Sequence, residues 1–180
     1  MRIFSDNTVA IAIDLQTHLI PAINNNNEIL KNSIKFIEGL NILGVPVIVT
    51  EQYKKGLGDT CDEIKNVLKE YKPYEKITFS AYADMDIKDA IDCLDVKNVL
   101  IFGTECHICV VQTIIDLIDA GYNVFLVEDC TGSRRENDKK YGINRAEFEG
   151  ACTVTSEAVL FELTGIAKTE KFKKILKIVK

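Results

Sequence analysis

The chain has 180 residues, of which 47% are hydrophobic and 27% charged, with a formal net charge of −5. These values suit one domain over residues 1–180, and scattered basic residues argue against a nucleic-acid surface. No segment approaches the roughly 20 apolar residues of a membrane span and residues 1–10 lack a signal-peptide core, so we expect a cytoplasmic protein without a membrane partner.

The expected elements alternate between strands and helices along the whole chain. Near-continuous hydrophobic runs predict strands that are buried on both faces, as in a parallel sheet. Helical spacing, capping residues and terminal glycines predict the helices between them. In chain order we expect strand 8–14, helix 28–43, strand 45–51, helix 62–71, strand 74–78, helix 86–94, strand 99–105, helix 110–120, strand 123–129, helix 137–149, strand 152–155, helix 156–163 and an amphipathic helix in 168–180.

This alternation predicts a three-layer α/β/α sandwich with a central, mainly parallel six-stranded sheet of the Rossmann-like kind. In the common strand order 3-2-1-4-5-6, ligands bind beyond the carboxyl ends of strands one and four. Asp14 ends the first strand, Lys76 lies at the third, and Cys109 follows the fourth. The sequence therefore predicts that a carboxylate, an ammonium and a thiol meet in one cleft.

Asp14 and Lys76 each have an ordinary and a functional interpretation. An acid directly after five apolar residues is costly to bury without a partner. Asp14 is therefore either a strand-end acid that caps a helix or pairs with a lysine, or a general base for a nearby thiol. Lys76 is either solvated or points into the cleft, where it would hold Asp14 in place.

The stretch "GTECHICVV" holds two cysteines in C-x-x-C spacing around His107. A helix N-terminus stabilises a thiolate and an oxyanion, which favours Cys109 as a nucleophile over a buried core cysteine. A redox pair of Cys106 and Cys109 would be thioredoxin-like, but no suitably placed proline faces it. A zinc site would need a fourth ligand, and no second C-x-x-C or H-x-H is present.

Three motifs resemble the isochorismatase-like cysteine hydrolase family, in the family's order. They are "DLQ" with Asp14, "EKITFSAY" with Lys76 and "GTECHICV" with Cys109. The stretches "VTEQYKKGLG" and "TSEAVLFEL" are most similar to the isochorismatase-domain-containing subgroup. The resemblance implies that Cys109 attacks a carbonyl carbon, that Asp14 accepts the thiol proton, and that Lys76 orients Asp14.

The resemblance also implies a cis peptide between Thr104 and Glu105, and an oxyanion hole formed by the N–H groups of Glu105 and Cys109. Nicotinamidases carry a D-x-H metal site after the second strand, whereas this sequence reads "EQYKKG" there, with no histidine. The resemblance therefore implies no metal, and we expect no cofactor. We expect the following side chains to contact the substrate: Gln16, Gln52, Phe79, Tyr82 and His107.

The first functional hypothesis is a hydrolase of a small amide or carbamoyl-type substrate, working through a thioester on Cys109. The alternative is a catalytically silent scaffold of the same fold that binds a partner through surfaces such as residues 168–180. A third hypothesis is a thiol redox protein using Cys106 and Cys109. Family members commonly form homo-oligomers, so we expect one here.

Overall fold

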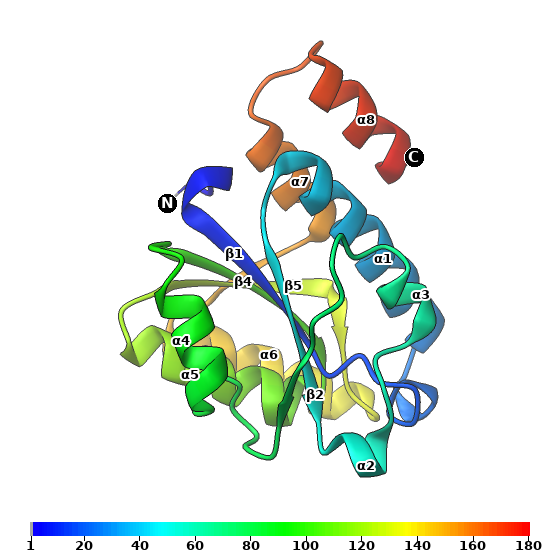
Figure 1. Cartoon of the computed structure of the whole chain (residues 1–180), viewed down its shortest axis with the longest axis vertical. Coiled ribbons are helices and arrows are strands. Elements are labelled where there is room, and N and C mark those ends of the chain that lie inside the picture. Colours follow the sequence, from blue (N-terminus) through cyan, green and yellow to red (C-terminus); the bar gives the residue numbers. More distant parts are fainter. Residues whose placement is uncertain (1) are drawn as a thin grey trace.

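The computed structural model describes residues 2–180 and contains one six-stranded sheet. Its strands are β1 (Thr8–Ile13), β2 (Val47–Gln52), β3 (Tyr74–Lys76), β4 (Asn98–Thr104), β5 (Asn123–Gly132) and β6 (Cys152–Val154). All neighbouring strands are parallel, in the order β3-β2-β1-β4-β5-β6 (Figure 1). The expected strand order and parallel sheet are therefore confirmed.

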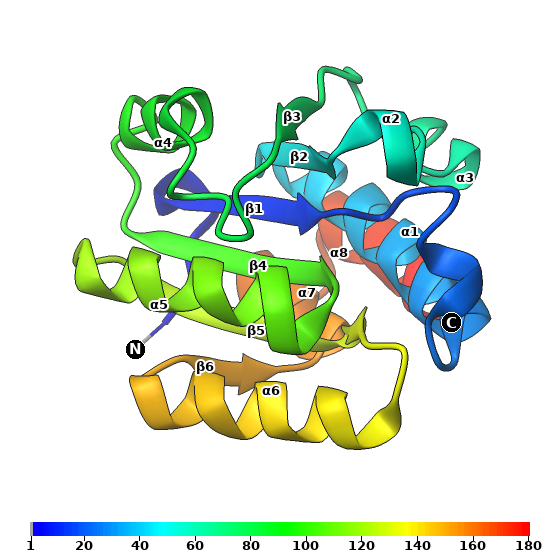
Figure 2. The same ribbon diagram turned by 90° about the horizontal axis from the view of Figure 1, so that it is seen from below.

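Helices cover both faces of the sheet, which confirms the three-layer sandwich (Figure 2). One face carries α1 (Asn26–Leu43), α3 (Asp62–Lys65), α7 (Ser156–Thr164) and α8 (Glu170–Val179). The other face carries α4 (Met85–Asp92), α5 (Val111–Asp119) and α6 (Glu136–Glu149). Among the helices of residues 2–180, none has both the length and the apolar character needed to cross a membrane.

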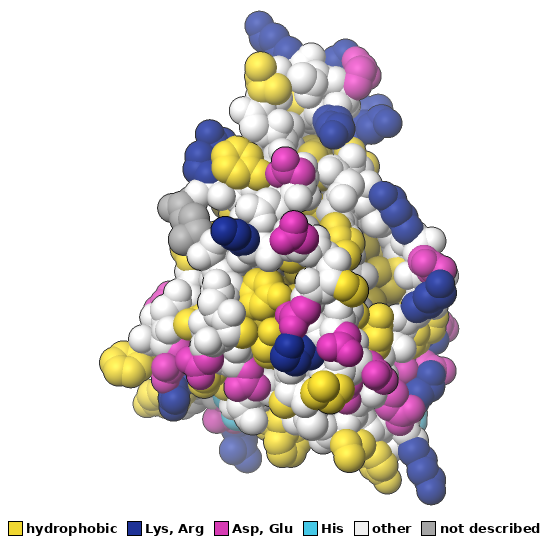
Figure 3. Space-filling model, turned by 60° about the vertical axis from the view of Figure 1, so that its left-hand side comes forward, with side chains coloured by type: hydrophobic (Ala, Val, Ile, Leu, Met, Phe, Trp, Pro, Cys, Tyr) yellow, Lys and Arg dark blue, Asp and Glu magenta, His cyan; other side chains and the backbone are white. Residues whose placement is uncertain are grey.

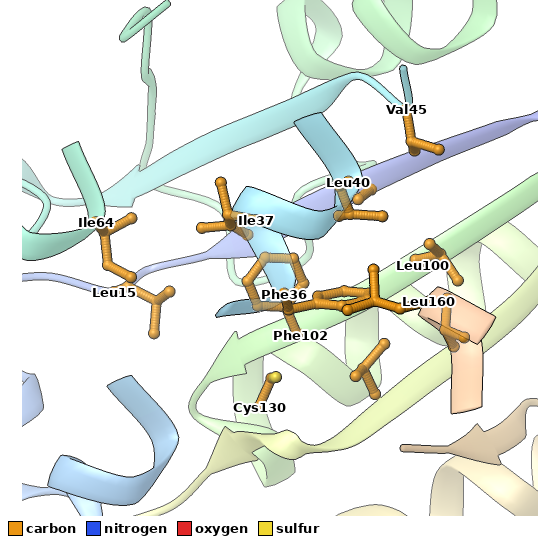
Figure 4. Packing of buried hydrophobic residues seen from close by; sticks show 14 of the residues in the cluster. Leu15, Phe36, Ile37, Leu40, Val45, Ile64, Leu100, Phe102, Cys130 and Leu160 are labelled. Carbon is orange, nitrogen blue, oxygen red and sulfur yellow. The ribbon is translucent and has the colours of Figure 1, made fainter. Parts of the chain in front are cut away.

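The central strands contribute to two hydrophobic cores because their side chains alternate between the faces. In β1, Ala10 packs into the core under α1, whereas Ile11 packs into the core under α5, and both are fully buried. The core under α1 includes an edge-on pair of Phe36 and Phe102, with ring centroids 5.4 Å apart (Figure 4). Fully burying one such large side chain contributes about 1.5–3 kcal/mol, so the sheet is firmly held between its helix layers.

Two expected elements differ most in length from those observed, and the strand expected at 74–78 also ends earlier, at Lys76. The helix expected at 62–71 covers only Asp62–Lys65, because the apolar residues after it do not sustain a helical stripe. Val67 and Leu68 instead pack against the core as the chain turns, and Asn41 Nδ2 donates to Val67 O at 2.7 Å. The strand expected at 123–129 continues to Gly132, because its last residues pair with the end of β4.

Four short elements were not expected, and three of them lie at the carboxyl ends of the strands. They are η1 (Ser5–Asn7) before β1, η2 (Ile20–Ala22), α2 (Lys54–Leu57) and η3 (Cys106–Val110). The last of these is a single π-helical turn that precedes α5, so Cys109 lies inside this turn rather than at the start of a regular α-helix.

Gly103 explains how β4 approaches β1 closely enough to bring their ends together. It has a φ of 120°, and a Cβ at this position would lie 2.0 Å from the carbonyl oxygen of Ile13. Only glycine fits that backbone conformation and that space. The chain leaves β1 at Asp14 and leaves β4 toward Cys109, so this contact sets the spacing of the two side chains.

Candidate active site

Asp14, Lys76 and Cys109 come from the ends of β1, β3 and the η3 turn, and all three are buried. The Nζ atom of Lys76 lies 2.9 Å from Oδ2 of Asp14. Cys109 lines the same cavity as Asp14 and lies close enough to both charged groups for each to alter its pKa. Asp14 and Lys76, which are 62 residues apart in the sequence, thus meet with Cys109 beyond the carboxyl ends of the strands.

The thiol of Cys109 is neutral in the resting protein. Burial raises its pKa to about 12, and the negative charge of Asp14 acts in the same direction, while the positive charge of Lys76 opposes both. A neutral thiol is a weak nucleophile, so attack requires that a base removes its proton. The carboxylate of Asp14 lines the same cavity and is the candidate base, because the other carboxylate there, that of Glu105, is paired with Arg134.

The ammonium group of Lys76 is fully enclosed by acceptors. Besides Asp14, its Nζ donates to Oε1 of Gln52 at 2.7 Å and to the carbonyl oxygens of Thr78 and Phe79, each at 3.3 Å. A buried charge is tolerated when it is paired and its remaining protons are hydrogen-bonded. These contacts fix Lys76 beside Asp14 as a charged partner.

Two threonines hold Asp14 in place, a role that was not expected for either of them from the sequence. Thr50 Oγ1 donates to Oδ1 of Asp14 at 2.7 Å, and Thr104 Oγ1 donates to the backbone carbonyl of Asp14 at 2.8 Å. Asp14 has a φ of 51°, in the left-handed region, so these bonds secure an uncommon backbone conformation. A hydroxyl in an otherwise apolar strand is the sequence signal that could have indicated them.

The cavity in front of Cys109 has a volume of about 360 Å³, which suits a small molecule. Most of the surface that lines it is apolar, and the polar part comes from the reacting groups and a few other polar side chains. The polar lining consists of Asp14, Gln52, Glu105, Cys109 and Arg134, and the apolar lining consists of Leu19, Ala22, Leu57, Phe79 and Ile108. Of the side chains expected to contact the substrate, Gln52 and Phe79 line this cavity.

Figure 3 shows one face of the molecule, on which hydrophobic side chains lie among charged ones. Tyr53, Ile77 and Phe79 are among the exposed hydrophobic residues of the chain. Of these, Phe79 also lines the cavity, so the apolar lining is exposed at the surface at this residue.

Glu105 links the η3 turn to Arg134, a residue that the sequence analysis missed. The peptide bond between Thr104 and Glu105 is cis, at the position that the resemblance implied. Glu105 Oε1 lies 2.6 Å from Arg134 Nε, and its Oε2 accepts from the backbone N–H of Arg134 at 3.2 Å. His107 is not among the residues that line the cavity, and its Nδ1 lies 3.0 Å from Ser133 Oγ. The cavity lining therefore does not support the expected contact of His107 with the substrate, which stays a prediction.

Gln16 and Tyr82 are likewise not among the residues that line the cavity. The amide of Gln16 is buried and bonds to the backbone, with Nε2 donating to the carbonyls of Gln52 at 3.0 Å and Gly58 at 2.7 Å. The hydroxyl of Tyr82 donates to Oδ1 of Asp92 at 2.8 Å on the far side of its loop. Gln16 thus has a structural role in shaping the site, and Tyr82 belongs to a surface cluster.

Cys106 faces the opposite side of the η3 turn from Cys109. It is fully buried against α6, and its Sγ donates to the carbonyl oxygen of Lys139 at 3.7 Å. Burial raises its pKa to about 12, and all six cysteines are free thiols. The geometry therefore favours Cys109 acting without Cys106.

Within residues 2–180 no cluster of three or more His, Cys, Asp or Glu side chains is arranged to hold a metal ion.

We predict that Gln52 positions Lys76 rather than the substrate. Its Oε1 accepts a hydrogen bond from Lys76, and its Nε2 donates to Ile77 O at 3.1 Å. Its backbone N–H and carbonyl both bond to the side chain of Gln16. Little of the Gln52 amide is therefore free to bind a ligand. We expect Gln52→Leu to lower kcat about tenfold while KM changes less than about twofold, because the lost contact supports the reacting groups. Steady-state kinetics on an accepted amide provides the test. A large rise in KM with unchanged kcat would instead show substrate binding by Gln52.

Residues 8–158 match the family described as Isochorismatase domain. The chain belongs to the isochorismatase family. It is 35% identical over 173 residues to the isochorismatase domain-containing protein 1 of Salmo salar, covering 96% of this chain and 61% of that protein. This isochorismatase-family chain thus spans less than two thirds of the length of that relative.

Two solved structures show the same isochorismatase-like fold. The MAR1 ribonuclease of Caenorhabditis elegans superimposes with a TM-score of 0.93 at 37% identity, covering 99% of this chain and 92% of that one. The YcaC gene product of Escherichia coli, described as an octameric hydrolase of unknown specificity, has a TM-score of 0.93 at 19% identity, covering 99% and 90%.

Proposed function

We propose that this isochorismatase-family protein is a cysteine-dependent hydrolase of small amide or carbamoyl-type substrates. The observation that supports this most is the buried ion pair of Asp14 and Lys76 beside a neutral thiol in one small cavity. A carboxylate held by a buried ammonium is a fixed general base, and a thiol within its reach is a nucleophile that it can activate.

In the acylation step, Asp14 takes the proton of Cys109 as Sγ forms a bond to the substrate carbonyl carbon. The tetrahedral intermediate then collapses, the C–N bond breaks, and the proton on Asp14 passes to the leaving amine. Lys76 stays charged throughout and offsets the changing charge on Asp14.

In the deacylation step, Asp14 takes a proton from water, whose oxygen attacks the thioester carbonyl. The C–S bond breaks, and the proton returns to Sγ of Cys109. The N–H groups of Glu105 and Cys109 are the proposed donors to the carbonyl oxygen in both steps, and such a donor is commonly worth about 3–4 kcal/mol.

The cavity lining restricts the substrate class. An apolar body fits among the apolar lining side chains, and Arg134, whose side chain is 56% exposed and held by Glu105 through Nε, lines the same cavity. The terminal guanidinium nitrogens are well suited to an anionic or acceptor group. We therefore propose a small amide that carries such a group in addition to its scissile bond.

The ribonuclease name of the Caenorhabditis elegans relative raises RNA as another substrate. RNA binding depends on a basic surface that contacts several phosphates. The chain has a net charge of −5, and its cavity contains a single arginine. The geometry therefore favours a small-molecule substrate.

The test is ammonia release from a panel of small primary amides and N-carbamoyl amino acids, each anionic member matched with its neutral methyl ester. We expect wild type to turn over at least one member and Asp14→Asn to turn over none. We expect Arg134→Gln to reduce kcat/KM for the anionic member about 10- to 100-fold and for its neutral ester less than about threefold.

The silent-scaffold hypothesis predicts no ammonia release above the Asp14→Asn background from any member. Equal losses for the anionic and neutral members in Arg134→Gln would contradict the proposed role of Arg134. A single domain over residues 1–180, the absence of a metal or cofactor, a cytoplasmic location and a homo-oligomeric state stay predictions.

A further inference from the structure

Residues 77–81 follow β3 and precede α4, and we call this segment the β3 loop (Figure 2). It supplies two of the acceptors that surround the ammonium group of Lys76. The carbonyl oxygens of Thr78 and Phe79 each accept from Lys76 Nζ at 3.3 Å, and Phe79 also lines the cavity. The position of the β3 loop therefore affects where the ammonium group of Lys76 lies.

Thr113, in the first turn of α5, joins the β3 loop to the turn that carries Cys109. Its Oγ1 accepts from the backbone N–H of Ala81 at 2.8 Å and donates to the carbonyl oxygen of Cys109 at 2.7 Å. Thr113 and Ala81 are both fully buried. Within residues 2–180, this is the one hydrogen-bonded link between the β3 loop and the segment from η3 to α5.

The hydroxyl group of Thr113 can make both bonds at once because it donates one hydrogen bond and has two acceptor lone pairs. In helices the Oγ1 of threonine can donate to the carbonyl oxygen four residues earlier, which is that of Cys109 here. Valine has nearly the same shape but makes neither bond, so Thr113→Val removes the link and little else. The side chain of Ala81 packs in the core under α5, so the variant should keep its fold.

A different set of contacts places Asp14 relative to Cys109. Thr104 Oγ1 donates to the backbone carbonyl of Asp14, and β4 approaches β1 closely at Gly103. These contacts lie at the ends of the two central strands and do not involve the β3 loop. Loss of the link at Thr113 would therefore leave Asp14 beside Cys109 but would free the loop that holds the ammonium group.

We propose that Thr113 is a positioning residue that fixes the spacing between Lys76 and Cys109. The inference rests on the proposed hydrolase function, in which these two side chains act together. Thr113 is not among the residues that line the cavity, so it acts through the backbones of Cys109 and the β3 loop. At the spacing that it fixes, the positive charge of Lys76 lowers the pKa of the Cys109 thiol.

The first test compares the kinetics of Thr113→Val with those of Thr113→Ser, which keeps the hydroxyl group. For an accepted amide, we expect Thr113→Val to lower kcat about tenfold while KM changes less than about twofold, because the change acts mainly on the reacting groups. We expect Thr113→Ser to stay within about threefold of wild type in both parameters.

The second test is alkylation of Cys109 by iodoacetamide at pH 8 without substrate, followed by peptide mass spectrometry. We expect it to be about threefold slower in Thr113→Val, because Lys76 then lowers the pKa of the thiol less, and close to the wild-type rate in Thr113→Ser. A general loosening of the structure would expose the thiol and speed alkylation instead, so the direction of the change separates the two causes.

Thr164→Val on α7 is the matched control, and we expect it to leave kcat and the alkylation rate unchanged. Thr164 Oγ1 donates to Leu160 O at 2.6 Å, the same contact to the carbonyl four residues earlier, on the opposite face of the sheet. Wild-type kcat and alkylation in Thr113→Val, faster alkylation in Thr113→Val, or equal losses in Thr113→Ser would overturn the proposal. If wild type turns over no amide, the proposed hydrolase function fails, while the alkylation rates still decide whether Thr113 positions the thiol.

Discussion

We expect Cys109→Ala and Cys109→Ser to abolish amide turnover while the protein keeps its fold. This is the largest effect that we expect on activity, because both variants remove the atom that forms the covalent bond to the substrate. Cys109 is buried, but alanine and serine both fit its space, so the thermal midpoint should change little. Ammonia release and thermal unfolding, measured side by side, separate the loss of activity from a loss of structure. Turnover by Cys109→Ala above the Asp14→Asn background would contradict the proposal.

The raised pKa of Cys109 gives this prediction a pH dependence. Because the pKa is about 12, the thiolate fraction is small at pH 7 and rises about tenfold for each pH unit up to pH 9. Alkylation of Cys109 by iodoacetamide in the absence of substrate should rise in the same proportion, as followed by peptide mass spectrometry. A rate that is already constant above pH 7 would show a thiolate at neutral pH.

Variants of the two charged partners should move this alkylation rate in opposite directions. The negative charge of Asp14 raises the pKa of Cys109, so Asp14→Asn should lower that pKa and speed alkylation at pH 8 while it abolishes turnover. The positive charge of Lys76 lowers the pKa, so Lys76→Met should slow alkylation. A general loss of structure would speed alkylation in both variants.

Lys76→Met should be the most destabilising charge substitution at the site and should also abolish turnover. Its removal leaves the carboxylate of Asp14 buried without a cation, which commonly costs about 3–5 kcal/mol of unfolding free energy. Denaturant unfolding measures this loss. The double variant Asp14→Asn/Lys76→Met removes both charges and should recover a substantial part of the stability, without recovering activity.

Lys173→Met is the matched control for this measurement. Lys173 pairs with Glu170 at 2.7 Å, but both side chains are more than half exposed. An exposed ion pair contributes about 0–1 kcal/mol, so the control should unfold within about 1 kcal/mol of wild type. An equally small loss for Lys76→Met would contradict the view that Asp14 depends on Lys76 as its buried counter-ion.

The sequence predicted the sheet and the meeting of Asp14, Lys76 and Cys109 because these depend on periodicity and strand order. Buried parallel strands give continuous hydrophobic runs, and their carboxyl ends lie at one edge of the sheet. Residues that directly follow such runs are therefore placed correctly by topology alone.

The cavity lining could not be predicted in the same way, because it depends on loops and on side-chain direction. Arg134 follows β5 after a three-residue extension that the hydrophobic pattern did not indicate. Gln16 follows Asp14 by two residues, yet the left-handed backbone at Asp14 redirects the chain, and the Gln16 amide points into the backbone of neighbouring loops. Tyr82 lies on the loop after Lys76, but its hydroxyl reaches Asp92 instead of the cavity.

The most direct test is the mass of the peptide that contains Cys109, after acid quenching of the protein during steady-state turnover of an accepted amide. We predict an increase equal to the acyl group of that amide, on Cys109 alone, which hydroxylamine removes and which is absent from Asp14→Asn. Continued turnover with an unmodified Cys109, or an acyl group on another side chain, would contradict a thioester mechanism.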